Sequence, residues 1–80
     1  MMKPERYRNL SGDSGVTYYA IGPDFIAVQF HDPTVYIYDH SRPGRAHVEQ
    51  MKVFAVGGRG LGSYISRHVR KAFARKQASW

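Results

Sequence analysis

The sequence predicts an α+β fold in which a three-stranded antiparallel β-meander is followed by two helices packed on one face. Three observations predict it. The first half of the chain holds three short runs of alternating polarity separated by tight turns, which is typical of an antiparallel sheet. The second half holds two segments with apolar residues at helical spacing, divided by a glycine-rich stretch. Strands followed by helices favour an α+β over an α/β architecture.

The strands are expected at residues 16–21, 25–30 and 34–40, with turns at "GPD" and "HDP" between them. Residues 1–15 are polar, contain Pro4 and a "SGDSG" stretch, and are expected to form a loose N-terminal arm. The folded domain would therefore begin at the first strand.

Alternation along the second and third runs defines two faces of the sheet, because successive side chains of a strand point to opposite sides. One face would carry Ile26, Val28, Phe30, Tyr36 and Tyr38, and the other would carry Ala27, Gln29, Val35 and Ile37. We expect Tyr36 and Tyr38 to pack inward with Ile65 and Val69 of the last helix. Val35 and Ile37 would then be exposed on the far face. The other possibility is that the two tyrosines face outward, where they could stack bases as an aromatic platform.

The first helix is expected within "RAHVEQMKVFA" (45–55), and the glycines that follow it suit a helix C-terminus. The second helix is expected to begin near Leu61, with one apolar stripe made by Leu61, Tyr64, Ile65, His68, Val69, Ala72 and Phe73. Beyond Phe73 a continuing helix would turn basic residues toward its apolar side. The sequence therefore predicts a single domain over 16–73 and a mobile basic tail over 74–80.

The stretch "GGRGLG" raises the possibility of a phosphate-binding loop between a strand at 51–56 and a helix. Its glycines at 58, 60 and 62 miss the G-x-G-x-x-G spacing, which requires a third glycine where this chain has Ser63. No acid follows Glu49 to bind a ribose, and no Lys-Ser/Thr pair follows Gly62 as a P-loop would need. We therefore expect no nucleotide cofactor, and we interpret the glycines as a break that lets two helices pack at an angle.

The sequence contains no motif for metal binding or catalysis. The four histidines have no zinc-ligand spacing, and there is no cysteine. Asp24, Asp32 and Asp39 stand at turns, where Asx side chains favour local backbone hydrogen bonds. We expect no catalytic residue, no metal and no enzymatic activity. The chain has neither an apolar run of membrane-spanning length nor an apolar signal segment, so we expect a cytoplasmic protein without a membrane contact.

The core "VQF…YIYDHSRPGRAHVEQMKVFAVGGRGLGSYISRHV" resembles the KTSC domain, a small domain also found at the C-terminus of some lysyl-tRNA synthetases. The family's central Y-x-Y is matched by Tyr36 and Tyr38. The preceding strand is matched by Ile26, Val28 and Phe30, and the late helix by Gly62, Tyr64, Ile65, His68 and Val69. The resemblance covers about residues 14–70. It departs at the first strand, where "DSGV" replaces the usual Ser-Ser-x-Ile entry, and at the extra glycines. It implies this fold, a structural role for the two tyrosines, and an RNA-related setting without an established activity.

The net charge of +6 lies entirely at the C-terminal end. Residues 1–58 carry six basic and six acidic side chains, whereas residues 59–80 carry only cations. These cations are Arg59, Arg67, Arg70, Lys71, Arg75 and Lys76. Such asymmetry favours a polyanionic partner, so the first hypothesis is a binding module for RNA or another nucleic acid. The second is a protein-interaction or accessory module, including a homodimer, that uses the exposed sheet face. A solvated face that serves only solubility stays open beside both.

Overall fold

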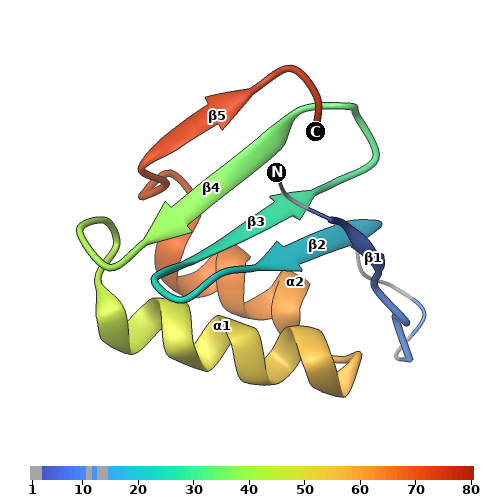
Figure 1. The fold of residues 1–80 in the computed structure, drawn as a ribbon. Coiled ribbons are helices and arrows are strands. Elements are labelled where there is room, and N and C mark those ends of the chain that lie inside the picture. Colours follow the sequence, from blue (N-terminus) through green and yellow to red (C-terminus); the bar gives the residue numbers. More distant parts are fainter. Residues whose placement is uncertain (1–2, 11, 13–14) are drawn as a thin grey trace.

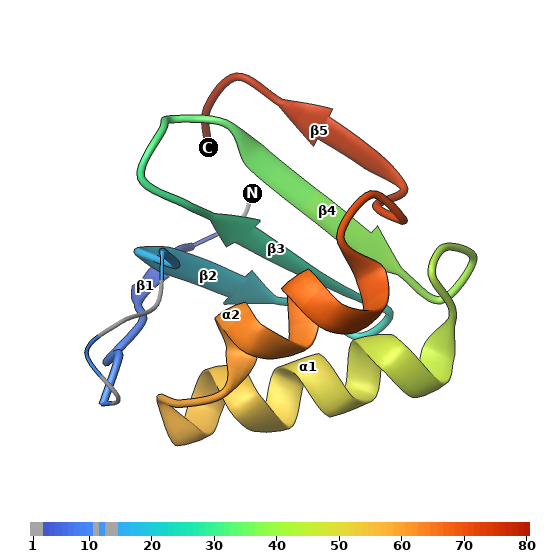
Figure 2. The same cartoon turned by 180° about the vertical axis from the view of Figure 1, so that it is seen from behind.

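The computed structural model describes residues 3–10, 12 and 15–80, which form a twisted sheet with helices on one face (Figures 1 and 2). Within these residues the sheet has five antiparallel strands in the order β1-β2-β3-β4-β5. The strands are β1 (Glu5–Arg6), β2 (Tyr18–Ile21), β3 (Phe25–Gln29), β4 (Val35–Asp39) and β5 (Arg75–Gln77). The predicted α+β class and the meander of β2, β3 and β4 are confirmed. The predicted number of three strands is wrong, because each edge of the meander carries one further short strand.

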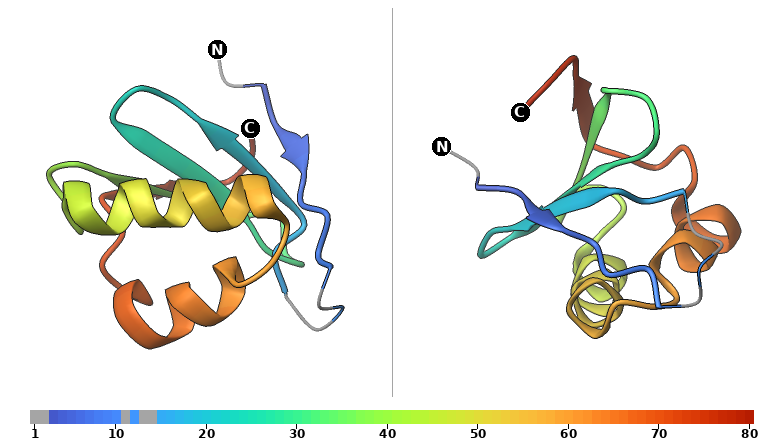
Figure 3. Two further views of the ribbon diagram at one scale, coloured as in Figure 1. Left: turned by 90° about the horizontal axis from the view of Figure 1, so that it is seen from below. Right: turned by 90° about the vertical axis from the view of Figure 1, so that its right-hand side faces the viewer.

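Both helices cover the same face of the sheet, as Figure 2 shows. The helical elements are α1 (Arg45–Gly57), α2 (Leu61–Tyr64) and η1 (Ile65–Val69), and η1 is a π-helical continuation of α2. The two helical segments lie side by side below the sheet (Figure 3). Residues 51–56 are helical, so the strand that a dinucleotide-binding unit would need is absent there. The regular helix stops at Val69 rather than continuing to Phe73 as expected.

The glycine-rich stretch forms the turn between α1 and α2. Gly58 and Gly60 have φ angles of 78° and 88°, in the left-handed region that favours glycine. The N–H of Gly58 donates to the carbonyls of Phe54 and Ala55 and so caps α1. A Cβ at Gly58 would also lie 3.0 Å from Cβ of Arg8. The glycines therefore end one helix and redirect the chain into the next, as the sequence predicts.

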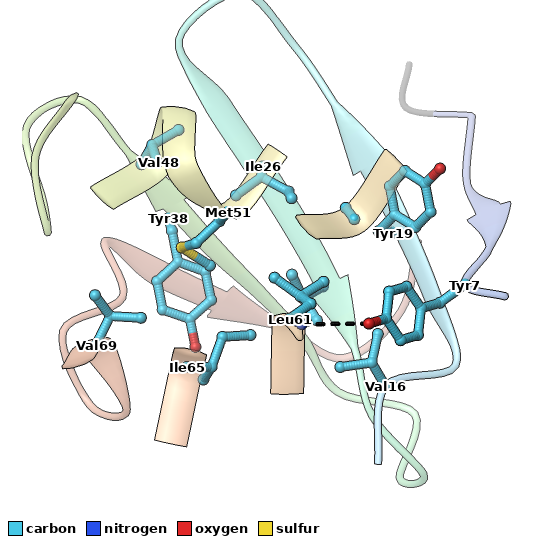
Figure 4. Packing of buried hydrophobic residues seen from close by; sticks show 12 residues of the cluster. Tyr7, Val16, Tyr19, Ile26, Tyr38, Val48, Met51, Leu61, Ile65 and Val69 are labelled. Carbon is cyan, nitrogen blue, oxygen red and sulfur yellow. Dashed lines mark hydrogen bonds between the residues drawn. The ribbon is translucent and has the colours of Figure 1, made fainter. Parts of the chain in front are cut away.

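The main core lies between the sheet and the helices (Figure 4). Tyr38 is 1% exposed and packs in the same cluster as Ile65 and Val69, while Tyr36 is half-buried against it. The prediction that both tyrosines pack toward the helices is confirmed. The ring of Tyr38 lies between Val69 and Ile65 in Figure 4, so β4 and η1 hold each other in place.

The far face of the sheet is also covered, and the expectation of an exposed surface there is wrong. Val35 and Ile37 are 0% and 1% exposed and form a second cluster with Ala20 and Ala27. Phe25 and Trp80 pack against this cluster. The indole Nε1 of Trp80 donates to Oε1 of Gln29 over 3.1 Å. The reason is that the chain folds back after β5 and brings an aromatic side chain over small β-sheet residues.

The N-terminal segment is docked rather than loose over the part that the structure describes. Glu5 and Arg6 pair with Tyr19 and Tyr18 of β2. Tyr7 is 2% exposed, and its hydroxyl accepts a hydrogen bond of 3.2 Å from the backbone N–H of Leu61 (dashed in Figure 4). The "SGDSG" part of the predicted arm falls largely on Ser11, Asp13 and Ser14, which lie outside the described residues.

Two further contacts tie this segment to the C-terminal end of α1. The Arg8 guanidinium donates to the carbonyl of Val56, and the N–H of Leu10 donates to the carbonyl of Gly58 over 2.7 Å. A cation at a helix C-terminus is favourable because it meets carbonyls without an intrahelical partner. These contacts explain why a polar segment without a strand pattern is nevertheless fixed.

The predicted mobile basic tail is also corrected. Ala74 donates its N–H to the carbonyl of Ile37 over 2.7 Å, and Arg75–Gln77 continues this pairing along β4. Backbone hydrogen bonds to an unpaired strand edge, rather than an apolar pattern, hold β5. This pairing puts Lys76 opposite Tyr36 and Arg75 opposite Ile37.

Candidate nucleic-acid groove

A groove of about 550 Å³ opens between the end of η1 and β5. We call it the aromatic groove. Its lining consists of Phe30, Tyr36, Tyr38, Phe73, Gly62, Ile65, Ser66, Arg70, Lys71 and Lys76. These residues come from β4, from β5, from the position directly after β3, from one side of the α2–η1 segment and from the turn after it. The site therefore depends on β5, which closes one side of it.

The floor of the aromatic groove is a chain of packed rings. The ring centroids of Phe30 and Tyr36 lie 5.7 Å apart, and those of Tyr36 and Phe73 lie 5.1 Å apart. Phe73 also meets the ring of Tyr38 edge-on at 6.4 Å. Phe30, Tyr36 and Phe73 are half-buried, so each keeps part of its ring open to the groove. The groove thus has an aromatic floor that is partly accessible.

Three cations stand around this floor. Arg70 and Lys71 follow η1 directly, and Lys76 extends from β5 on the same side as its pairing partner Tyr36. All three side chains are exposed, and none of the described residues that line the groove is acidic. A concave site with charges of one sign concentrates counter-ions of the other sign. The aromatic groove is therefore suited to an anion that carries an aromatic or apolar group.

The other three predicted cations lie elsewhere. Arg59 is exposed in the turn between α1 and α2, and Arg67 is exposed on η1 outside the groove lining. Arg75 neighbours Lys76 on β5 and so points to the opposite face of the sheet. There its charge adds to the hydrogen bond from Ser41 in lowering the pKa of Asp39. The structure thus brings together three of the six predicted residues and separates the other three.

The Tyr38 hydroxyl at the base of the groove carries no charge at physiological pH. Burial, with a smaller contribution from the neighbouring Tyr36, raises the pKa of Tyr38 to about 12. Since the phenol stays neutral at physiological pH, it adds no negative charge beneath the three cations. The electrostatic character of the groove is accordingly set by its rim.

The sequence did not mark Phe30 and Phe73 as site residues. Phe30 shares the alternation of β3 with Ile26 and Val28, and Phe73 ends the apolar stripe of the last helix, so both were assigned to the core. The signal that could have found them is position, because both stand at the end of a predicted element, where a core side chain borders solvent. Their pairing with Tyr36 requires the fold.

His68 was expected on the apolar stripe but is exposed, and its ring lies 4.6 Å from that of Tyr64. Tyr64 in turn contacts His47, whose Nδ1 is 2.7 Å from the tyrosine hydroxyl. Among the described residues, no group of three or more potential metal ligands comes together. Within the part of the chain that the structure describes, no helix is long and apolar enough to cross a membrane.

A larger hollow, of about 1040 Å³, is lined by residues of β1 and β2 together with Lys3, Phe25 and Arg75. It mixes both signs of charge and its lining includes side chains from both faces of the sheet, among them Tyr19 and Ala20. Its lining therefore has no single chemical character.

Comparison with protein-family models, with curated proteins and with solved structures finds no match to this chain. The resemblance to the KTSC domain therefore stays a prediction from the motif residues.

Proposed function

We propose that the chain is a non-enzymatic module that binds single-stranded nucleic acid through the aromatic groove. One observation carries the proposal: Arg70, Lys71 and Lys76 converge on a floor of half-buried aromatic rings. The choice of RNA over DNA rests on the resemblance to a domain associated with tRNA synthetases.

The physical argument combines two attractions. Lysine and arginine side chains replace counter-ions on phosphates, which supplies affinity that is independent of sequence. Exposed aromatic rings stack on bases, and every base offers a face for stacking. A basic groove with an aromatic floor is the arrangement by which proteins hold single strands without reading their sequence. We therefore propose little discrimination between sequences.

Fluorescence anisotropy with labelled single-stranded RNA, single-stranded DNA and duplex RNA, repeated across a salt series, tests this function. If the three cations of the groove each contact one phosphate, log K should fall against log salt with a slope of about −2, at about 0.7 per contact. A steeper slope, near −4, is expected only if all six cations engage at about the same 0.7 per contact. Anisotropy that stays flat for every nucleic acid at low salt contradicts the proposal.

The alternative of a protein partner, including a second copy of the chain, requires an exposed far face of the sheet, and that face is covered. Val35 and Ile37 were its contact residues, and both are buried beneath Trp80 and Phe25.

A further inference from the structure

We infer that the aromatic groove receives one unpaired nucleotide at a time, with the base on the rings and the phosphate at the rim. This inference rests on the proposed function and names the unit that the site recognises. It would make the chain selective for unpaired nucleotides and give it a measurable affinity for a free nucleoside monophosphate.

The dimensions of the groove set the size of its occupant. Its volume of about 550 Å³ falls in the range of sites that enclose a single small ligand. The rings lie at the floor, with η1 on one side and β5 on the other. A base in a duplex is paired and stacked on both faces, so it cannot reach a recessed ring unless it leaves the stack.

The packing of the rings determines how a base lies. Tyr36 and Phe73 already contact each other, with ring planes 56° apart, and leave no slot between them. A base must therefore lie on this floor rather than between two rings. Because the rings are tilted relative to one another, a base stacks on the face of one ring at a time. Every base offers such a face, and a purine covers more of the ring than a pyrimidine.

The charges determine where the phosphate lies. Arg70 and Lys71 follow η1 and Lys76 lies on β5, so cations from two parts of the chain line the same groove. A phosphate monoester carries between one and two negative charges at neutral pH, which suits such a cluster better than a neutral nucleoside. Base and phosphate thus bind through separate groups of side chains, and each contribution can be removed independently.

Nuclear magnetic resonance titrations with AMP, adenosine and ribose 5-phosphate separate the two contributions on the wild-type protein. AMP should bind at least about fivefold more tightly than ribose 5-phosphate, since stacking on an aromatic side chain contributes at least that factor. It should also bind more tightly than adenosine, and its shifts should centre on Tyr36, Phe73 and Lys76. Equal affinity for AMP and ribose 5-phosphate, or shifts centred elsewhere, overturns the inference.

A matched pair of variants carries the test to a polymer. Phe73→Leu removes one ring of the floor, whereas Tyr18→Leu removes an exposed ring outside the groove. Phe73→Leu should weaken binding of single-stranded RNA by about fivefold or more without changing the salt slope, and Tyr18→Leu should leave both unchanged. Thermal melts establish that both variants are folded, and the AMP titration stands if Phe73→Leu is not.

The outcomes distinguish this inference from the proposed function. Salt-dependent binding that is equal for single strands and duplex, and equal for wild type and folded Phe73→Leu, overturns the nucleotide site and leaves a phosphate-binding surface. Absence of any binding to RNA or DNA by the wild-type protein overturns the proposed function itself.

Discussion

At the scale of single residues, Tyr38 connects the core to the site. It is 1% exposed, packs between Ile65 and Val69, and still borders the base of the aromatic groove. Its burial raises the pKa of its phenol to about 12. One side chain therefore packs β4 against η1 and also forms part of the base of the site.

The raised pKa of Tyr38 predicts a loss of stability at alkaline pH. Between pH 10 and 12 the unfolded chain loses this proton while the folded chain retains it, so the free energy of unfolding falls as the pH rises. The loss amounts to about 1 kcal/mol by pH 11, because each unit of pKa difference corresponds to about 1.4 kcal/mol. Tyr38→Phe should not show this part of the loss.

Urea denaturation of wild type and Tyr38→Phe at pH 8 and pH 11 measures the difference. Tyr18→Phe, which alters a 40% exposed tyrosine, is the control and should lose as much stability as wild type. An equal loss in wild type and Tyr38→Phe would show that Tyr38 does not carry the alkaline transition.

At the scale of elements, the sequence predicts those that carry their own periodic pattern. The alternating runs around Ile26 and Tyr38 became β3 and β4, and the apolar spacing around Met51 became α1. The two edge strands carry no such pattern, because Glu5–Arg6 and Arg75–Gln77 are polar and are held by backbone pairing with a neighbour. Their anchors, Tyr7 and Trp80, contact residues far away in the sequence, so local periodicity could not reveal them.

The candidate site was predictable only in part, because its charge is a local feature of the sequence and its geometry depends on the fold. The cationic end of the chain is visible in the sequence, but a rotation of about 100° per residue assigns Arg67, Arg70 and Lys71 to one face. The π-helical turn of η1 changes that rotation, and Arg70 and Lys71 line the groove while Arg67 does not. Lys76 joins them only because β5 pairs with β4. Charge could be predicted from the sequence, and its geometry required the fold.

The turn between α1 and α2 predicts opposite effects for two adjacent glycines. Gly58→Ala should destabilise the protein by about 1–2 kcal/mol, because its φ of 78° is costly for a side chain and a Cβ would crowd Arg8. Gly57→Ala should be neutral or stabilising by up to about 1 kcal/mol, since Gly57 is helical and a Cβ there meets nothing within 4 Å. Chemical denaturation of both variants checks this contrast, and equal destabilisation by the two would contradict this account of the turn.

At the scale of the whole molecule, both faces of the sheet are covered, each by a different part of the chain. The helices bury one face of the sheet, the returning C-terminal segment covers the other, and the cations remain at the surface. Of the six cations that follow residue 58, three line the aromatic groove with its rings. The other three lie on other surfaces. The central claim is that position, rather than total charge, determines binding.

Two double variants that remove the same charge test this claim most directly. Arg70→Ala with Lys71→Ala removes two cations of the aromatic groove, and Arg59→Ala with Arg67→Ala removes two exposed cations outside it. In a salt series with single-stranded RNA, the first pair should flatten the slope of log K against log salt by about 1.4. The second pair should leave the slope nearly unchanged, because neither side chain lines the groove and so neither replaces a counter-ion on the phosphates bound there. An equal loss of affinity and slope in the two double variants would show that the charge acts as a diffuse field and would contradict a binding site in the groove.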